Sequence, residues 1–283
     1  MSRPRAKKSG DYPEAEERET VDRKTIHIGN KRVLCVTYEK KKSINLFIGG
    51  HETWCIHAEL IKDGNKFKPR GYLIKIRYDT LCSLDHNFTR GHDTRMLLQW
   101  FIRYIHDIYS DVKELSFNDI SIRTCDNQTD VSLAVMTYLY SGITWYQKTF
   151  GAVLSEESKS VFELYQKKLE DAKKISWDDM KDTIRNRELL PYTEEELEGQ
   201  YEAASTWKKF FEPIHRTVGM SAFCNFVSGW LDKFILKYFN NLQGIIYLLP
   251  IHPIPVSYTV KEYSRGGRRF TRKNLTRSAK DYR

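Results

Sequence analysis

The sequence has no uninterrupted run of about 20 apolar residues, which is the length that a transmembrane helix requires. Its most apolar region, between Phe210 and Leu249, is interrupted by Lys233 and Lys237, and three prolines follow between positions 250 and 255. The sequence therefore predicts no transmembrane segment. The prolines predict an extended path for residues 251–256, because proline cannot continue a helix.

Paired cysteine motifs are also missing, and so is the basic, apolar and small-residue pattern of a signal peptide. The five cysteines lie far apart, at Cys35, Cys55, Cys82, Cys125 and Cys224. We therefore expect an intracellular protein with reduced thiols. The eight histidines show no metal-ligand spacing, so no metal site is predicted, and neither a Walker loop nor a nucleophile elbow is present.

The length and the apolar content of the chain are sufficient for a folded protein. The chain has 283 residues, of which 40% are hydrophobic, so it can bury a substantial core. The pattern predicts four parts: an N-terminal arm over residues 1–23, an α/β domain over 24–154, a helical extension over 155–260 that ends in the proline-rich segment, and a basic tail over 261–283.

The clearest pattern begins with an expected strand over Gly71–Tyr78, which is rich in β-branched and aromatic residues and alternates from Leu73 onward. A loop follows to Gly91. Apolar residues three or four apart then predict a helix that ends near Ile108, with Asp93 as its N-cap. The stretch Val112–Asn118 is expected to form a second strand.

A second helix is expected over Val131–Tyr140, and a motif dense in aromatic residues follows, bounded by Gly142 and Gly151. The order of strand, Arg-Gly loop, helix, strand and a helix ending in Trp-Tyr-x-x-x-Phe-Gly-Ala resembles the GCN5-related N-acetyltransferase fold. The sequence of the motif from Gly142 to Ala152 is more specifically similar to proteins of large nucleocytoplasmic DNA viruses. The resemblance covers about residues 24–154 and implies an acetyltransferase-like mixed sheet flanked by helices.

The resemblance also implies a place for acetyl-coenzyme A. Members of the family bind its pyrophosphate on a loop of small residues at a helix N-terminus, where backbone N–H groups and the helix dipole favour anions. The corresponding residues here are Arg90, Gly91, His92, Asp93, Thr94 and Arg95. A carboxylate at Asp93 would face the pyrophosphate and Arg95 would fill the channel, so we expect a degenerate site without cofactor. The alternative for Asp93 is an ordinary helix cap.

Tyr146 stands where the resemblance implies a general acid that reprotonates the leaving thiolate. The competing interpretation is packing, because Trp145, Tyr146 and Phe150 have helical spacing and aromatic stripes usually belong to the core. Candidate general bases are Glu114, Asp119, His86 and His92. The spacing selects none of them.

Positive charge is concentrated at the two ends of the chain. Residues 261–283 carry a net charge of +7 out of +9 for the whole chain, and the first eight residues carry +4. Such segments bind phosphate backbones or acidic protein surfaces. We expect them to contact neighbouring capsid proteins and, weakly, nucleic acid, while the alternative is a solubilising end. The expected partner-binding residues are Arg265, Arg268, Arg269, Arg272, Lys273 and Arg277.

The region from Ser155 to Gln200 is expected to be helical and acidic, with an apolar stripe that includes Val161, Leu164 and Leu169. Thr193 and Glu196 form the pattern of a capping box, which predicts that a helix begins near Glu194.

Two functions remain open from the sequence. The first is a structural protein of a large double-stranded DNA virus, a minor capsid or virion assembly protein made in the host cytoplasm. The second is an acetyl-coenzyme A-dependent N-acetyltransferase. The residues of the loop Arg90–Arg95 favour the structural function.

Overall fold

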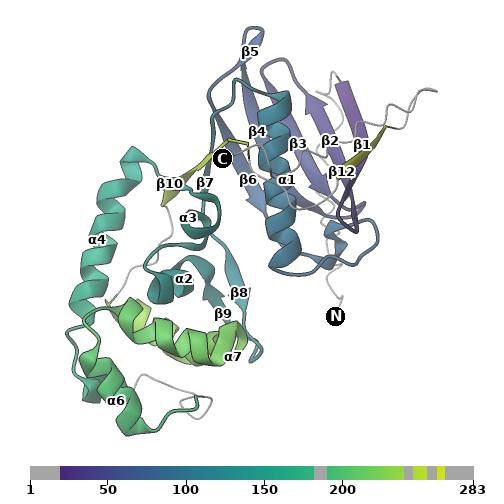
Figure 1. The fold of residues 1–283 in the computed structure, drawn as a ribbon. Helices are drawn as coiled ribbons and strands as arrows, with labels where there is room; N and C mark the ends of the chain where they lie inside the picture. The colour runs from purple at the N-terminus through teal and green to yellow at the C-terminus, as the bar shows by residue number, and fades with distance from the viewer. Residues whose placement is uncertain (1–19, 182–189, 239–244, 254–259, 265–283) are drawn as a thin grey trace, which may run out of the picture. The chain divides into compact units, whose positions relative to one another are not determined.

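The computed structural model of the chain describes residues 20–181, 190–238, 245–253 and 260–264 (Figure 1). These residues form an α/β fold with a large sheet and flanking helices, as the sequence predicts. The chain divides into two compact units. Unit 1 contains the residues up to Val112 together with those after His252, and unit 2 contains Lys113–His252. The division falls inside the stretch 24–154, and the acetyltransferase-like arrangement remains a prediction.

Unit 1 is built on an antiparallel sheet with the strand order β6-β4-β3-β2-β1-β12, and the short strand β5 pairs with β4. Its elements are β1 (Thr20–Ile28), β2 (Lys31–Glu39), β3 (Ser43–Gly49), β4 (Trp54–Asp63), β5 (Lys66–Phe67), β6 (Arg70–Ile76), the 3-10 turn η2 (Thr80–Cys82), α1 (His92–Ile108) and β12 (Val260–Ser264).

The helix α1 lies across one face of this sheet (Figure 1). Its apolar residues recur three or four apart and are buried, among them Leu97, Phe101 and Ile105, except for the terminal Ile108, which is 59% exposed. The strands supply the other half of this core through alternate residues, such as Val33 and Cys35 of β2. The helix predicted from this spacing is therefore confirmed, because its 3.6-residue period matches one buried face.

The strand expected over residues 71–78 is β6, which runs from Arg70 to Ile76. It is half buried, but its apolar residues do not all face the core. Leu73 is buried, whereas Tyr72 and Ile74 are 48% and 54% exposed. The side chains of neighbouring residues point to opposite faces of a strand, so burial of Leu73 leaves both neighbours on the other face.

Unit 2 pairs β11 with β7 and β10 in antiparallel fashion and adds the hairpin β8–β9 and six helices among its described residues. Its elements are β7 (Glu114–Asn118), β8 (Ile122–Thr124), β9 (Asp130–Ser132), α2 (Leu133–Ser141), α3 (Trp145–Phe150), β10 (Val153–Leu154), α4 (Glu156–Ala172), α5 (Trp177–Lys181), α6 (Glu194–Ala203), α7 (Trp207–Tyr238) and β11 (Ile246–Pro250). The strand expected over 112–118 and the helix expected over 131–140 correspond to β7 and α2.

Each unit contains a disulfide, so the expectation of reduced thiols is wrong. Cys55 pairs with Cys82 in unit 1, and Cys125 pairs with Cys224 in unit 2, with Cα atoms 5.7 and 5.5 Å apart. The paired residues are 27 and 99 positions apart in sequence. Local spacing cannot reveal such pairs, because the fold brings them together. Cys35 lies outside both disulfides and is buried.

The disulfide of unit 2 fastens the β8–β9 hairpin to α7. Two further bonds support this attachment near the turn of the hairpin, since the backbone N–H of Asn127 donates to Asn225 Oδ1 over 3.2 Å and Asn127 Nδ2 donates to Ser228 Oγ over 2.8 Å. Asp126 accepts a further bond from the hydroxyl of Ser221. The hairpin is too short to be stable alone, so these links hold it in place.

The acidic helical region contains α4, α5 and α6. The capping box is confirmed, because Thr193 Oγ1 accepts from the N–H of Glu196 and the Glu196 carboxylate accepts from the N–H of Thr193. The predicted stripe on α4 is wrong in part. Phe162 and Leu169 are buried, whereas Val161 and Leu164 are 43% and 52% exposed. The buried face is therefore rotated by about one residue from the predicted one.

The long apolar region is the helix α7, which is interrupted at Gly219, where φ is 75°. Within the described part of the chain, no helix is long and apolar enough to cross a membrane. The expected extended segment over 251–256 is described only as far as Pro253.

The expected tail beginning at residue 261 needs a correction. Residues 260–264 form β12, which pairs with β1 from Ile28↔Val260 to Lys24↔Ser264. The first four residues of the predicted tail therefore belong to the sheet of unit 1. The six expected partner-binding residues between Arg265 and Arg277 lie outside the described residues, as do residues 1–19 of the expected arm.

Candidate functional site at the start of helix α1

The loop between β6 and α1 carries the candidate cofactor site and is tied to two strands of unit 1. The disulfide from Cys82 attaches it to Cys55 on β4. Leu84 N–H donates to the carbonyl of Arg32 over 2.7 Å, and the guanidinium of Arg32 binds both carboxylate oxygens of Asp85. The loop is thus anchored on β4 and β2, which fixes the direction from which the chain enters α1.

Helix α1 begins directly after Gly91, whose φ of 81° favours glycine. Gly91 is the N-cap and provides no side-chain capping bond, so the prediction that Asp93 is the N-cap is wrong. Asp93 instead lies in the first turn of the helix, two positions further on. Its side chain turns back toward the loop and into the protein, where it is only 3% exposed.

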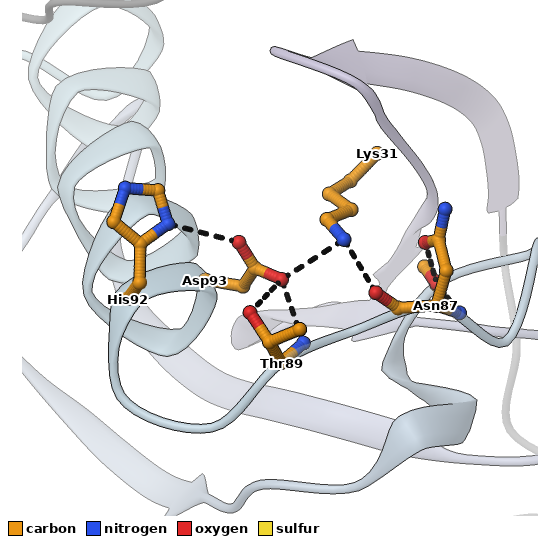
Figure 2. A network of polar contacts seen from close by, with 6 residues as sticks. Lys31, Asn87, Thr89, His92 and Asp93 are labelled. Atoms are coloured by element: carbon orange, nitrogen blue, oxygen red, sulfur yellow. Dashed lines mark hydrogen bonds and ion pairs between the residues drawn. The ribbon is translucent and has the colours of Figure 1, made fainter.

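The carboxylate of Asp93 is the centre of a polar network (Figure 2). Its Oδ2 accepts hydrogen bonds from the backbone N–H and the hydroxyl of Thr89, over 2.6 and 2.7 Å. The same oxygen lies 3.1 Å from Nζ of Lys31, and Oδ1 lies 3.0 Å from Nδ1 of His92. Lys31 also donates to the carbonyl of Asn87. Both members of the ion pair are buried, since Lys31 is 6% exposed.

This geometry explains the acidity of Asp93. Burial by itself raises the pKa of the carboxyl group, but the bonds from Thr89, His92 and Lys31 outweigh burial and lower its pKa to about 2. The negative charge also lies at the positive end of the α1 dipole, which stabilises it further. The positive end of the α1 dipole favours a negative charge, and the Asp93 carboxylate already provides one from within the chain.

The pKa of Asp93 predicts a loss of stability in acid. The carboxyl has an ordinary pKa of 3.8 when unfolded, and its folded pKa is lower, so its stabilising contribution is present above about pH 4 and is lost as the pH falls toward 2. The contribution is about 2 kcal/mol at neutral pH. We expect urea unfolding to show that Asp93→Asn lowers the free energy of unfolding relative to the parent, and that this difference is larger at pH 5.5 than at pH 3. An equal difference at both pH values would contradict this assignment.

Arg90, His92 and Arg95 of the candidate loop project outward, whereas the hydroxyl of Thr94 is buried and has no hydrogen-bond partner among the described residues. Arg90 and Arg95 are exposed, and the guanidinium of Arg90 lies 5.8 Å from the centre of the Tyr78 ring. The side chain of His92 is 83% exposed, and Thr94 is half-buried. The expectation that the Asp93 carboxylate faces a bound pyrophosphate is wrong, because that group points inward.

Lys31 is the residue that the sequence analysis missed. It follows the two-residue turn Gly29-Asn30 between β1 and β2, with Gly29 in the left-handed region at φ 59°. It is 62 positions away from Asp93 in sequence, and a lysine after a turn is typical of a solvated surface. The only sequence signal was its place on the buried face of β2, two residues before Val33.

The candidate acid Tyr146 belongs to unit 2, on α3, and is 3% exposed. Its ring packs against Phe117 with ring centres 4.6 Å apart, and against Trp145 and Phe150. Burial, followed by the nearby Asp119, raises the pKa of its hydroxyl far above the ordinary value of 10. These are features of a packed phenol, and its catalytic role remains a prediction.

Among the candidate bases, Asp119 is the one that the structure brings close to Tyr146. The N–H of Ser121 donates to Asp119 Oδ1 over 3.0 Å, and Ser121 Oγ lies 3.4 Å from the Tyr146 hydroxyl. Burial raises the pKa of Asp119, and its Oδ2 has no hydrogen-bond partner among the described residues. The side chains of Asp119 and Tyr146 are therefore both buried in unit 2, beside the exposed Ile120.

The described residues contain no group of three or more His, Cys, Asp or Glu side chains that could hold a metal ion. Comparisons of the chain with protein-family models, with curated proteins and with solved structures find no match. The functional argument therefore rests on the geometry described above.

Proposed function

We propose that this chain is a structural protein of a large double-stranded DNA virus particle, a minor capsid or assembly component on an acetyltransferase-like domain without a cofactor. The observation that carries the proposal is the Lys31–Asp93 ion pair at the start of α1. A buried carboxylate already compensates the helix dipole there, and its charge is neutralised by Lys31. A pyrophosphate would gain little from this helix end.

The two disulfides support the same proposal. Disulfides form and persist in oxidising environments, which include the surfaces of virus particles, and they are rare in cytosolic enzymes. Cys55–Cys82 and Cys125–Cys224 each join elements distant in sequence and are buried. They stabilise a protein that must persist outside the cell, whereas a cytosolic acetyltransferase has no need of them.

Neighbouring capsid proteins are the partners in this proposal. Unit 2 exposes apolar side chains that such a neighbour can cover, including Ile120 and Ile122, which are 75% and 57% exposed. Val161 and Leu164 lie one turn apart on α4 and add an apolar strip on one helix face.

Titration with acetyl-coenzyme A tests the proposal. A ligand raises the melting temperature in proportion to ln(1 + [L]/Kd), so a chain without a cofactor site should melt unchanged at about 1 mM acetyl-coenzyme A. ATP at the same concentration is the control for nonspecific binding of phosphates. A saturable upward shift with acetyl-coenzyme A alone, together with acetyl transfer to an amine, would favour the N-acetyltransferase alternative and overturn the structural proposal.

A further inference from the structure

The sheet of unit 1 has a second face, opposite the one that α1 covers (Figure 1). Helix α1 is the only α-helix described in unit 1. Val33 and Cys35 of β2 face α1, so Val36 of the same strand projects from the second face. Phe47 of β3 lies opposite Val36, and His57 of β4 lies opposite Phe47. The second face can therefore be followed from strand to strand through directly paired residues.

An aromatic cluster lies at the centre of the second face. The rings of Phe47 and His57 are stacked with their centres 4.1 Å apart. The centres of the Tyr38 and Trp54 rings lie 5.4 and 5.6 Å from that of Phe47. Burial lowers the pKa of His57 to about 4, so its ring is neutral near pH 7. The cluster is therefore uncharged, and it supports Trp54, which is half-buried and packs against it.

A run of exposed positive charge passes this cluster on β5 and β6. Between positions 64 and 78 the chain has five basic residues and no acidic residue, and all five are exposed: Lys66, Lys68, Arg70, Lys75 and Arg77. Residues 9–260 carry a net charge of only −2, because the two ends account for +4 and +7 of the +9 of the chain. Lys68 and Lys75 make no ion pair with any described residue, whereas Arg77 lies 3.0 Å from Asp79. The two lysines are therefore the cations of this run that are most available to a ligand.

A bulge in β6 places a tyrosine and a lysine together on the second face. Lys75 lies opposite His57 and Tyr72 lies opposite Glu59, so the two residues are three positions apart on β6 while their partners are two apart on β4. In a regular strand, residues three apart point to opposite faces. The extra residue in β6, Ile74, removes this alternation, so Tyr72 and Lys75 both project from the second face. Both are exposed, Tyr72 to 48%.

Two accessible rings thus lie on either side of Lys75. Tyr72 is opposite Glu59, and Trp54 is five positions from Glu59 along β4, which corresponds to about 16 Å in a strand. Lys75 lies between them, opposite His57. Glu59 is half-buried, so its charge is less accessible than that of the exposed Lys75. The second face therefore presents a ring, a cation and a ring in that order.

We propose that the second face of unit 1 binds single-stranded nucleic acid along β6. Lys68 and Lys75 meet phosphate groups, and Tyr72 and Trp54 are the rings on which unpaired bases stack. A surface that combines cations with accessible rings binds single strands of any sequence, because every phosphate carries charge and every base has a π-face. The site goes beyond the proposed structural function and does not rest on it.

A single strand fits this face better than other polyanions do. In a duplex the bases are already paired and stacked, so the rings of Tyr72 and Trp54 would find no unpaired base. An acidic protein offers carboxylates but no bases for these rings. An anionic membrane requires a broad apolar face, whereas Ile74 is the only exposed Ile, Leu or Val between positions 64 and 78.

The test uses the full chain and a fluorescein-labelled oligothymidylate of about 20 bases, with binding followed by anisotropy from about 50 to 300 mM salt. The charge variant replaces Lys68 and Lys75 with glutamine. Its matched control makes the same change at Lys41 and Lys42, which are equally exposed but lie in the turn between β2 and β3.

A second pair of variants tests the rings. Tyr72→Thr removes the ring but keeps a residue that favours strands, so the fold should be retained. Its control is Tyr78→Thr, at a tyrosine that is 38% exposed and whose ring centre lies 6.5 Å from that of Phe88, in the loop before α1. Urea unfolding of each variant checks that the fold is intact.

We expect the Lys68 and Lys75 variant to lose about tenfold in affinity at about 50 mM salt and to lower the slope of log affinity against log salt by about 1.4, the value for two phosphate contacts on a single strand. The Lys41 and Lys42 control should lose no more than about twofold. Tyr72→Thr should weaken binding at least about fivefold without changing the slope, because stacking releases no counterions. Tyr78→Thr should bind like the parent.

Four results would overturn the proposal. The site does not exist if the parent fails to bind the oligothymidylate at about 50 mM salt. Overall charge is responsible if both lysine variants lose the same affinity. The rings do not stack on bases if Tyr72→Thr binds like the parent. The partner is of another class if a duplex, polyglutamate or vesicles with phosphatidylserine bind as tightly as the single strand and lose as much affinity in the Lys68 and Lys75 variant.

Discussion

Replacing Cys125 and Cys224 together with alanine is expected to lower the free energy of unfolding by about 4.7 kcal/mol. The disulfide closes a loop of 99 residues, and the loss of loop-closure entropy from the unfolded chain sets this value in the chain-entropy model. The β8–β9 hairpin would then be attached to α7 through side-chain hydrogen bonds such as that from Asn127 to Ser228. Guanidinium unfolding under oxidising conditions measures the change.

The second disulfide provides the matched comparison. Replacing Cys55 and Cys82 with alanine should lower the free energy of unfolding by about 3.5 kcal/mol, because the loop that this disulfide closes spans only 27 residues.

A thiol titration of the oxidised protein in denaturant should find one reactive cysteine per chain, Cys35. Five reactive thiols, with no stability change in the double variants, would show that the protein keeps its cysteines reduced.

Phe150→Ala is expected to destabilise the protein by about 3 to 5 kcal/mol, the usual cost of removing a buried aromatic side chain. Phe150 is 4% exposed and its ring centre lies 5.4 Å from that of Trp145 and 6.3 Å from that of Tyr146. Thermal and urea unfolding of the purified variant provide the measurement.

Two variants separate packing from catalysis at this cluster. Tyr146→Phe keeps the ring and removes only a 3.4 Å contact with Ser121, so its stability should stay within about 1 kcal/mol of the parent. Ile143→Ala, at a residue that is 42% exposed, should change stability by about 0.5 kcal/mol or less. If Phe150→Ala melts like the parent while acetyl transfer by Tyr146→Phe collapses, the cluster is catalytic.

The parts of the fold that could be predicted from the sequence are set by contacts between residues that lie close together in the sequence. The apolar spacing of α1 and the capping box at Thr193 and Glu196 each involve residues within a few turns of one another, and both appear in the structure. The error on α4 has the same local origin. Its sequence offers two apolar faces one residue apart, and tertiary packing selects the face with Phe162 and Leu169.

The features that the sequence could not predict depend on distant residues. Lys31 meets Asp93 because β2 lies beside the loop that precedes α1, and neither residue carries a motif. The disulfides and the pairing of β12 with β1 likewise join segments far apart in the chain. At the candidate site, the sequence predicted a helix start near Arg90–Arg95, and α1 indeed begins at His92, but the direction of the Asp93 side chain depends on its distant partner Lys31.

A double-mutant cycle at Lys31 and Asp93 tests most directly the claim that this pair closes the start of α1. Lys31→Met and Asp93→Asn each leave a buried partner uncompensated, so each should cost about 3 kcal/mol, whereas the double variant should cost at least about 1.5 kcal/mol less than their sum. The exposed pair Lys159–Glu156 is the control, with an expected coupling of about 0.5 kcal/mol or less. Costs at Lys31 and Asp93 that add within about 0.5 kcal/mol would show that the two residues are not partners. The helix end would then remain available to an anionic ligand, and the account would be contradicted.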